Sequence, residues 1–361
     1  MNYINNTNSI YIKAINVTFS IIPLSYVIGS FVLNFNIALL IVLGIFFQKR
    51  ELFKFNLNKV DKLIIVFFFF IIITALINTF ENLSKYKVND FTVLYKTFFY
   101  LRYLLLYFVL RFFIQKNIIN FKWFFISSSA LCLFVSLDIF FQFFNEKDIF
   151  GFVSPHPRKL PGPFGNELIA GGYLQRFSLL IFFIFPVFFQ LKNKFFRNVM
   201  VITAFTIVLA AIVLSGNRMP LFLFILVVSL IIILEKKTRI FFPLFILSTS
   251  ILLFILYNSN ITIKNNLKSF YSKTSQLSKA LVSEKIDRSK MPGHFHEFET
   301  FYDTWLMNKY IGGGLRSFRL NCPKRPNVEK EKDERTTCNN HPHNYYLEIL
   351  TDLGVVGLLI L

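Results

Sequence analysis

Apolar runs close in length to a membrane-spanning helix recur along most of the sequence, and no other feature limits the possible folds as strongly. A helix of about 20 apolar residues crosses the hydrocarbon core of a bilayer. The chain of 361 residues is 54% hydrophobic and contains 49 Phe, more apolar surface than a soluble domain of this length needs. The runs lack the polar–apolar alternation of membrane-barrel strands. They cover residues 16–30, 31–47, 63–80, 94–114, 121–144, 168–190, 198–214, 221–234 and 240–257, with a last run from Tyr345 onward.

These runs predict an all-α, polytopic integral membrane bundle of about ten spans. Residues 1–257 form the transmembrane bundle, which holds the first nine runs. Residues 258–343 form one large loop domain, and residues 344–361 start a further span. The last run stops at Leu361 without a basic cap. We therefore expect a truncated C-terminus, with one or more spans missing.

The distribution of basic residues predicts which loops face the cytoplasm. A net charge of +19 would suit a nucleic-acid partner, but much of the excess lies in short loops between apolar runs, as the positive-inside rule describes. We expect membrane lipids and no nucleic acid as partners. With the N-terminus inside, the inner loops are residues 48–62, 115–120, 191–197 and 235–239. The outer loops are then residues 81–93, 145–167, 215–220 and 258–343.

Residues 341–357, which read HPHNYYLEILTDLGVVG, place several polar side chains where the long outer loop enters the last apolar run. Polar and ionisable groups at such a position are expensive to bury and are often functional. If a helix starts near this point, Asn344 and Glu348 lie one turn apart on the same face. His341 and His343 precede them. The segment is therefore a candidate catalytic motif.

A structural interpretation of the same segment is equally consistent with the motif alone. A helix starting near Pro342 would need a polar N-cap, and Asn339 or Asn340 could supply it. The two histidines would then be ordinary residues of the membrane interface. The motif does not decide between these interpretations.

The long outer loop contains a segment that predicts an amphipathic helix. Within residues 294–318, four aromatic residues recur at helical spacing, which suits a helix lying on the bundle or at the membrane interface. They are Phe298, Phe301, Tyr302 and Trp305. We therefore expect ordered structure in this loop rather than a flexible linker.

Three consecutive glycines end that helix at residues 312–314, and Arg316 and Arg319 follow. Glycine allows close approach of the backbone, and exposed N–H groups would suit an oxyanion. A nucleotide-binding P-loop is excluded because the strand and the lysine of that motif are missing. The alternative is a glycine-rich turn with solvated arginines.

Five arginines on the predicted outer side are candidates for an anion site. Arg158 and Arg176 flank a loop ending in GPFGNE, and Arg218 lies in a predicted helix break. The guanidinium group of one arginine can donate two parallel hydrogen bonds to phosphate oxygens. An arginine at the end of a span is often only an interfacial anchor, but together with Arg316 and Arg319 these residues predict an electropositive pocket.

Cys322 and Cys338 enclose the charged tip of the outer loop, residues 323–337. Outside the cytoplasm such a pair is normally oxidised, so we expect a disulfide. A metal site formed by the cysteines with His341 and His343 is the alternative. It is disfavoured because the usual ligand spacings are missing, and no metal is expected.

From about residue 161 to Leu361, the chain resembles the O-antigen ligase and O-antigen polymerase family of bacterial envelope glycosyltransferases. The resemblance rests on SGNRMPL at residues 215–221, on the aromatic helix running into IGGG, and on HPHNYYLEILTDLGVVG. Ligases of the family carry a histidine followed by Asn, Ser or Gln, then nine residues and a glycine. His343, Asn344 and Gly354 match that pattern.

The resemblance implies a membrane enzyme of cell-surface polysaccharide or lipopolysaccharide biosynthesis in the bacterial cytoplasmic (inner) membrane. The donor would be a glycan on a polyprenyl diphosphate such as undecaprenyl diphosphate. A hydroxyl of a glycan or lipid-linked acceptor on the periplasmic face would receive it. Arginines can stabilise a diphosphate leaving group without a metal, so we expect an inverting enzyme that needs no metal and no cofactor.

Roles for individual residues follow from this chemistry. His343 is the candidate general base, since histidine takes up a proton near neutral pH. His341 is the alternative base, and His294 is a weaker third candidate. Asn344 and Glu348 would orient the imidazole or bind sugar hydroxyls. Among the arginines, Arg218 ranks first because it lies in the SGNRMPL stretch.

Two departures from the family pattern limit the assignment. Many relatives have an arginine before the aromatic helix of the loop, where this chain has His294 and His296, with Arg288 nearby. The threonines that follow the glycine in ligases are replaced by Gly357 and Leu358. These differences favour a polymerase-like or generic ligase-like member.

Two other functions fit the same residues. A transporter or flippase for an anionic lipid-linked glycan would use the arginines without chemistry, although transporters usually show internal repeats with broken helices at mid-depth. A protein O-oligosaccharyltransferase would differ only in its acceptor.

Overall fold

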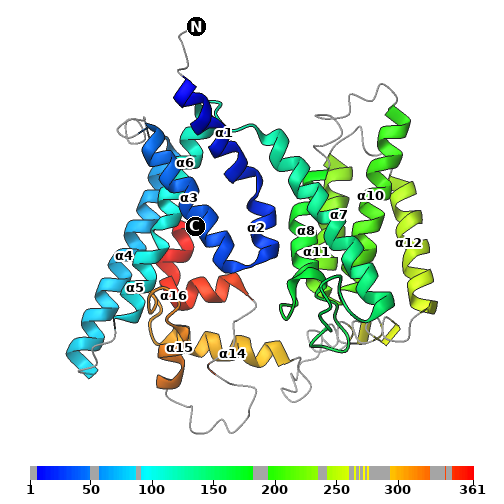
Figure 1. Cartoon of the computed structure of the whole chain (residues 1–361). Coiled ribbons are helices and arrows are strands. Elements are labelled where there is room, and N and C mark those ends of the chain that lie inside the picture. The colour runs from blue at the N-terminus through cyan, green and yellow to red at the C-terminus, as the bar shows by residue number, and fades with distance from the viewer. Residues whose placement is uncertain are drawn as a thin grey trace. The chain divides into compact units, whose positions relative to one another are not determined.

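The structure is a computed structural model that describes most of the chain. Within the described residues the regular structure is helical, with one isolated bridge between Lys147 and Val153 (Figure 1). The all-α prediction is therefore confirmed for this part of the chain. The described residues are 6–48, 57–86, 91–181, 194–234, 242–259, 264–265, 268, 271–272, 275, 293–325, 338 and 344–361.

Among the residues that the structure describes, four helical segments are long and apolar enough to cross a membrane. A fifth results if a pair of helices bent by 47°, Ile10–Ser20 and Ile22–Ile28, is one broken span. In the described part of the chain, three shorter apolar helices coincide with other predicted runs: Val199–Leu214, Arg218–Ile231 and Ile246–Asn258. The predicted number of about ten spans is therefore not confirmed. The four long segments are Ser30–Phe47, Lys59–Glu81, Thr92–Gln115 and Phe121–Asn145.

The chain divides into two compact units, each continuous in space but not in sequence. Unit 1 comprises residues 1–47 and 113–272, and unit 2 comprises residues 48–112 and 273–361. Each unit therefore combines an early part of the chain with a later one. The predicted outer loop at residues 258–343 falls mostly in unit 2.

Unit 1 is built around the long helix α7 (Phe121–Asn145). Its core is apolar and includes Cys132, Ile139 and Leu209, all fully buried. The side chain of Tyr173 is buried as well, and its hydroxyl donates a hydrogen bond to the carbonyl of Pro23 at 3.2 Å. The other elements of the unit are α1 (Asn6–Ser20), α2 (Ile22–Ile28), α3 (Ser30–Gln48), η2 (Gly162–Phe164), α8 (Ala170–Phe177), η3 (Ser178–Leu180), α10 (Lys194–Leu214), α11 (Arg218–Leu234) and α12 (Phe242–Ser259).

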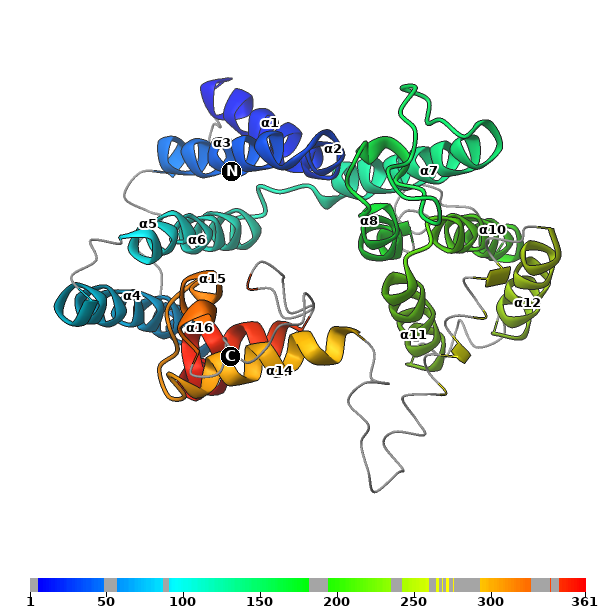
Figure 2. The ribbon, with the colours of Figure 1, turned by 90° about the horizontal axis from the view of Figure 1, so that it is seen from below.

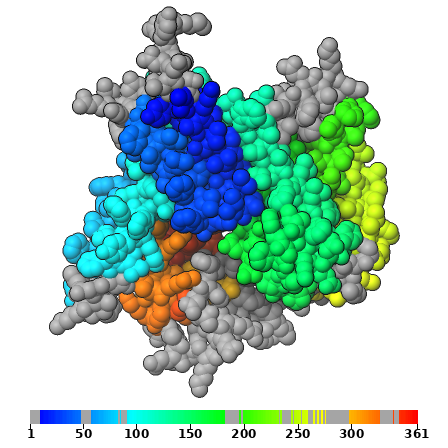
Figure 3. All heavy atoms as spheres, in the orientation of Figure 1, coloured from blue at the N-terminus to red at the C-terminus, as the bar shows by residue number. Residues whose placement is uncertain are grey.

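The two predicted runs at residues 16–30 and 31–47 form a helical hairpin with shifted boundaries. The turn lies at Gly29, whose φ of 138° suits glycine, instead of after residue 30. The first arm is bent between α1 and α2, where Pro23 stands in the first turn of α2. Phe31 and Phe35 of α3 are 81% and 63% exposed, as expected for side chains that meet lipid. Figure 3 shows the surface of these N-terminal helices in blue.

Unit 2 combines three helices of the early chain with the loop region and the last helix. The helix α14 packs against α16, and Figure 2 shows the two side by side. The predicted span at residues 94–114 is divided at Leu101, but it continues in the same direction as one candidate span. The elements are α4 (Lys59–Tyr86), α5 (Thr92–Tyr100), α6 (Arg102–Gln115, whose last residues belong to unit 1), α14 (Gly293–Leu306), α15 (Phe318–Asn321), η6 (Cys322–Lys324) and α16 (Tyr345–Ile360).

A buried ion pair fixes the start of α4 to α6. The carboxylate of Asp61 is fully buried and lies 2.8 Å from the guanidinium of Arg111. It also accepts hydrogen bonds from the Tyr107 hydroxyl at 2.6 Å and from the Asn58 backbone N–H at 2.6 Å. The side chain of Asn58 accepts in turn from the N–H of Asp61 at 2.8 Å, so the two residues form a capping box. The charges of Asp61 and Arg111 are therefore structural.

Candidate active site

Arg218 stands at the start of α11, directly after a break in the helical backbone. The break covers Ser215, Gly216 and Asn217, and Gly216 has a φ of 71° that ends α10. The sequence predicted a longer break, to Pro220, but Arg218 and Pro220 form the first turn of α11. The side chain of Arg218 is half-buried at this N-terminus. A helix start attracts anions, because its first N–H groups and the helix dipole face them.

The loop that carries Arg158 packs against this break. The backbone N–H of Leu160 donates a hydrogen bond to the carbonyl of Ser215 at 3.3 Å. The carbonyl of Arg158 lies so close to Gly216 that a Cβ atom there would overlap it. The side chain of Arg158 is exposed. Backbone contacts therefore bring the Arg158 loop to the Arg218 break.

The helix α8, which carries Arg176, meets the same break. A Cβ atom on Gly171 would lie 2.6 Å from the Ser215 hydroxyl oxygen and 2.9 Å from Cβ of Asn217. The guanidinium of Arg176 extends back along α8, with Nη1 3.8 Å from a Cβ atom placed on Gly172. The side chain of Arg176 is exposed. Unit 1 thus gathers three elements at one break, and each element carries one of the predicted arginines.

In unit 2, Asn344 of the predicted catalytic motif is the N-cap of α16. Its side-chain oxygen accepts hydrogen bonds from the backbone N–H of Tyr346 at 3.0 Å and of Leu347 at 3.3 Å. The expected helix start near Pro342, with Asn339 or Asn340 as the cap, is therefore wrong. Capping satisfies N–H groups that a helix start otherwise leaves unpaired.

The two histidines of the motif, His341 and His343, lie outside the described residues. Glu348 lies in the first turn of α16, one turn after Asn344, and its side chain is half-buried. His294 stands in the first turn of α14, where the structure describes only its backbone. The catalytic roles of these residues stay predictions.

The glycine of the motif breaks α16. Gly354 has φ 65° and ψ −168°, so the helix before it ends and a second one starts. Beyond the break, the N–H groups of Val355 and Val356 donate to the carbonyls of Lys309 and Tyr310 at 2.9 and 3.1 Å. The nine residues between Asn344 and Gly354 are therefore one helical segment between an N-cap and a break. The spacing that carries the family resemblance has a structural basis.

The three glycines at residues 312–314 form a turn against that break, and their N–H groups are used inside the protein. The expectation that these groups are free for an oxyanion is therefore wrong. Glycine is needed because the turn lies directly on the backbone of α16. The N–H groups of Gly312, Gly313 and Gly314 donate to the carbonyls of Asn308 at 3.0 Å, Thr351 at 2.9 Å and Asp352 at 2.8 Å.

Two glycines interlock where the turn meets α16. A Cβ atom on Gly312 would overlap the backbone of Asp352, and one on Gly354 would overlap the backbone of Tyr310. Both glycines have positive φ, 70° and 65°. The carbonyl of Gly312 also accepts a hydrogen bond from the side chain of Asn78 at 3.1 Å. Helices α4 and α16 therefore hold the turn from different directions.

Arg316 follows this turn with its backbone held and its side chain exposed. The carboxylate of Asp352, 5% exposed, accepts hydrogen bonds from the N–H of Arg316 at 2.7 Å and of Ser317 at 3.3 Å. The ammonium of Lys96 donates to the carbonyl of Arg316 at 3.2 Å. The side chain of Arg319 is exposed too.

Asp352 and Lys96 were not among the predicted site residues. An acidic residue inside an apolar run was the available signal for Asp352, because such a residue usually has a specific partner. Its partners are backbone N–H groups more than thirty positions away in the sequence, so the sequence could not name them. Nothing in the sequence distinguished Lys96 from a lysine that reaches for the membrane surface.

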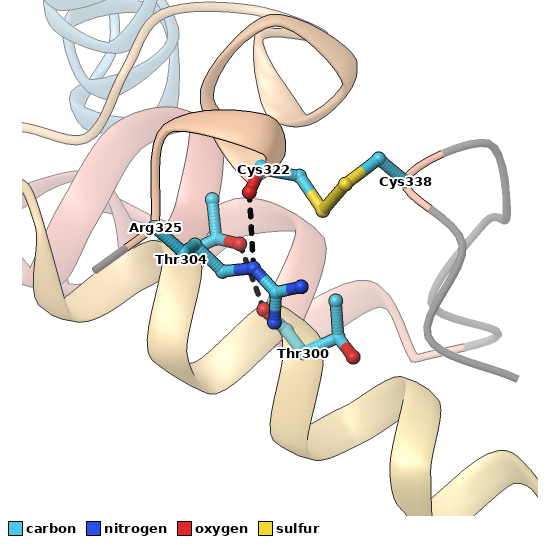
Figure 4. The surroundings of a disulfide bond; sticks show 5 residues. All are labelled: Thr300, Thr304, Cys322, Arg325 and Cys338. Atoms are coloured by element: carbon cyan, nitrogen blue, oxygen red, sulfur yellow. Dashed lines mark hydrogen bonds between the residues drawn. A yellow bond between two sulfur atoms is a disulfide. The ribbon is translucent and has the colours of Figure 1, made fainter. Parts of the chain in front are cut away.

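A disulfide joins Cys322 and Cys338, the pair named in the sequence analysis, with Cα atoms 5.6 Å apart (Figure 4). These cysteines are therefore not available as thiolate ligands for the alternative metal site. Beside the bridge, the buried Arg325 donates from Nε to the carbonyl of Cys322 at 3.0 Å and lies against α14 near Thr300 and Thr304.

The predicted amphipathic helix is present as α14, but its buried face differs from the predicted aromatic stripe. Phe301 is buried and stacks on Phe318, with ring centroids 3.5 Å apart. Thr300 and Thr304 are buried beside it, whereas Tyr302 is 48% exposed. Packing against α15 and α16 therefore selects a different face from the one suggested by aromatic spacing.

The comparisons with known proteins support the family resemblance. Residues 202–361 match the family model described as O-antigen ligase. This match includes the break at residues 215–217, Arg218, the glycine turn with Arg316 and Arg319, and α16. It does not include Arg158 or Arg176. No curated protein and no solved structure matches the chain.

Proposed function

We propose that this chain, whose residues 202–361 match the O-antigen ligase family, is a membrane glycosyltransferase. It transfers a glycan from a polyprenyl-diphosphate carrier to a hydroxyl of a glycan or lipid-linked acceptor. The observation that carries the proposal is the family match, because it covers both Arg218 and the segment ending at Gly354. The helices long enough to cross a membrane suit a lipid-linked donor.

The arginines supply the charge stabilisation that this reaction needs. A diphosphate leaves with negative charge, and fixed cationic donors lower the barrier to its departure. In unit 1, exposed Arg158 and Arg176 lie on elements that meet the start of α11, where Arg218 stands. In unit 2, Arg316 and Arg319 are exposed beside the glycine turn. We rank Arg218 first, since it combines a guanidinium with a helix N-terminus.

His343 is the proposed general base. The acceptor oxygen bonds to the anomeric carbon while the bond from that carbon to the phosphate oxygen breaks. The hydroxyl proton passes to His343, and the electron pair leaves with the diphosphate. A single displacement of this kind inverts the anomeric configuration and uses no metal. His341 and His294 are the alternative bases, and Asn344 with Glu348 orients the base or the sugar.

The active side of the membrane is proposed to be the periplasmic face of the bacterial cytoplasmic membrane. Contacts within each unit support this assignment. In unit 1, the loop with Arg158 touches the break at Ser215, and both segments were predicted to lie outside. In unit 2, Gly314 packs on Val93, and Lys96 donates a hydrogen bond to the carbonyl of Arg316. These contacts join the predicted outer loops at residues 81–93 and 258–343.

Reconstituted vesicles test the proposal directly. Purified protein is supplied with a polyprenyl-diphosphate donor carrying a labelled glycan and with separate glycan, lipid-linked and protein acceptors. Labelled product with inverted linkage is expected with a glycan or lipid-linked acceptor, and His343→Ala should lower the rate about 10²–10⁴-fold. Movement of donor across the bilayer without product would identify a transporter, and product only on protein would identify a protein O-oligosaccharyltransferase.

A further inference from the structure

We infer that Asp352 and Lys96 are positioning residues that hold the Arg316 peptide from both sides, so that its guanidinium is presented to the diphosphate of the donor. This inference rests on the proposed function. It adds two residues that bind no substrate themselves and act through Arg316.

Two side chains, a carboxyl group and an ammonium group, bond to the two ends of Arg316. The Asp352 carboxylate accepts the N–H of Arg316 at 2.7 Å, and the Lys96 ammonium donates to the carbonyl of Arg316 at 3.2 Å. The second carboxylate oxygen accepts the N–H of Ser317 at 3.3 Å. Hydrogen bonds to charged groups are stronger than neutral ones. Both peptide groups that flank the Arg316 Cα are therefore fixed.

The backbone of Arg316 needs this support. Its φ is 54°, in the left-handed region that residues other than glycine seldom adopt. Such a conformation persists where the surroundings determine it, and it occurs often at functional sites. The conformation aims the side chain outward, where it is exposed. A fixed backbone together with an exposed guanidinium makes Arg316 a preorganised binding group for an anion.

Asp352 is itself rigidly placed. It lies two residues before the break at Gly354, and its carbonyl accepts the N–H of Gly314 at 2.8 Å. The carboxylate and the carbonyl of one residue therefore both bind the loop that carries Arg316. Lys96 comes from α5, where Val93 packs against Gly314. Helices α5 and α16 thus determine the position of Arg316.

A double-mutant cycle with Arg316→Ala distinguishes positioning from general stabilisation. Asp352→Asn keeps one acceptor oxygen and the size of the side chain. If Asp352 acts through Arg316, Asp352→Asn should raise the KM for the labelled donor about tenfold or more, since small displacements of a binding group are costly. In protein that already lacks the Arg316 side chain, the same substitution should change KM by less than about twofold.

Asp148→Asn is the matched control. Asp148 is a buried carboxylate of unit 1 that accepts the N–H groups of Phe150 and Phe152 at 3.0 and 2.7 Å. Like Asp352→Asn, this substitution replaces a buried carboxyl group that holds a loop. Any general effect of such a replacement should therefore occur in both variants. We expect its effect on KM to add to that of Arg316→Ala, without coupling.

Lys96→Gln provides a second cycle if Asp352→Asn does not fold. It should raise the donor KM about threefold, and this effect should vanish with Arg316→Ala. Additive effects in the cycles that fold, or an unchanged KM, would overturn the inference while leaving the proposed function intact. Wild-type protein that transfers no glycan and does not bind polyprenyl diphosphate would overturn both.

Discussion

The backbone break before Arg218 and the glycine turn before Arg316 present an arginine in similar ways, but they are held differently. In unit 1 the break lies inside a helical hairpin, and it is packed by backbone contacts with the Arg158 loop and with Gly171. In unit 2 the turn belongs to a long excursion. It is held by a buried carboxylate, a lysine and two interlocked glycines, and a disulfide closes the chain further along the same excursion.

The difference follows from the length of chain that must be ordered. Two helices joined by three residues, Ser215 to Asn217, restrict each other, so little else is needed to place Arg218. A loop between residues 258 and 343 has much more conformational entropy to lose. Specific contacts must offset that loss before Arg316 has a fixed position. We therefore expect unit 2 to be the more sensitive region to substitution of its anchors.

Among the substitutions that test this comparison, Gly354→Ala should lower the stability of the protein most. Alanine would have to adopt φ 65° and overlap the Tyr310 carbonyl, which together should cost roughly 2–5 kcal/mol of unfolding free energy. Gly165→Ala is the control in unit 1. Gly165 has φ 60° and ψ −113° with open space around it, so this substitution should carry only the backbone cost of roughly 1–3 kcal/mol. Thermal unfolding in detergent measures both. Equal losses would show that the interlock contributes nothing beyond backbone conformation.

Arg218→Ala should lower the rate of glycan transfer about 10²–10³-fold, the usual cost of removing one donor that stabilises a developing charge. Arg218→Lys keeps the charge but loses the planar fork, so it should restore only part of the rate. A native rate in Arg218→Ala would remove Arg218 from the site.

Reduction of the disulfide should affect the unit 2 region alone. Cys322 and Cys338 are 16 positions apart, and a bridge across a loop of about this size stabilises by roughly 3 kcal/mol in the chain-entropy model. Alkylation of native protein without reductant should spare both cysteines, while Cys322→Ser should destabilise α14 and leave α7 protected in hydrogen exchange. Full labelling of either cysteine in native protein would refute the bridge.

Local pattern was sufficient for much of the fold. The helix at residues 121–145 was predicted almost to the residue, because polar residues flank its apolar run on both sides. The break at Gly216 was visible as a polar interruption between two apolar runs. The Asp61–Arg111 pair and the Asp352 anchor were not predicted, since their partners lie far away in the sequence. The predicted role of the glycine turn was wrong because the N–H groups of Gly313 and Gly314 donate to carbonyls of α16, which is a non-local contact.

The smallest effect is expected at Asn344, and it separates the two interpretations of the motif. Its side-chain oxygen caps α16 through Tyr346 and Leu347, so Asn344→Ala should cost about 1 kcal/mol of stability. Asn344→Ser and Asn344→Asp keep an N-cap and should restore that stability. If Asn344 also orients His343 or a sugar, Asn344→Asp should recover the stability but lose about tenfold in kcat. If it only caps the helix, stability and kcat should recover together, and Asn344 would leave the list of catalytic residues while Gly354 and the cap still explain the spacing of the motif.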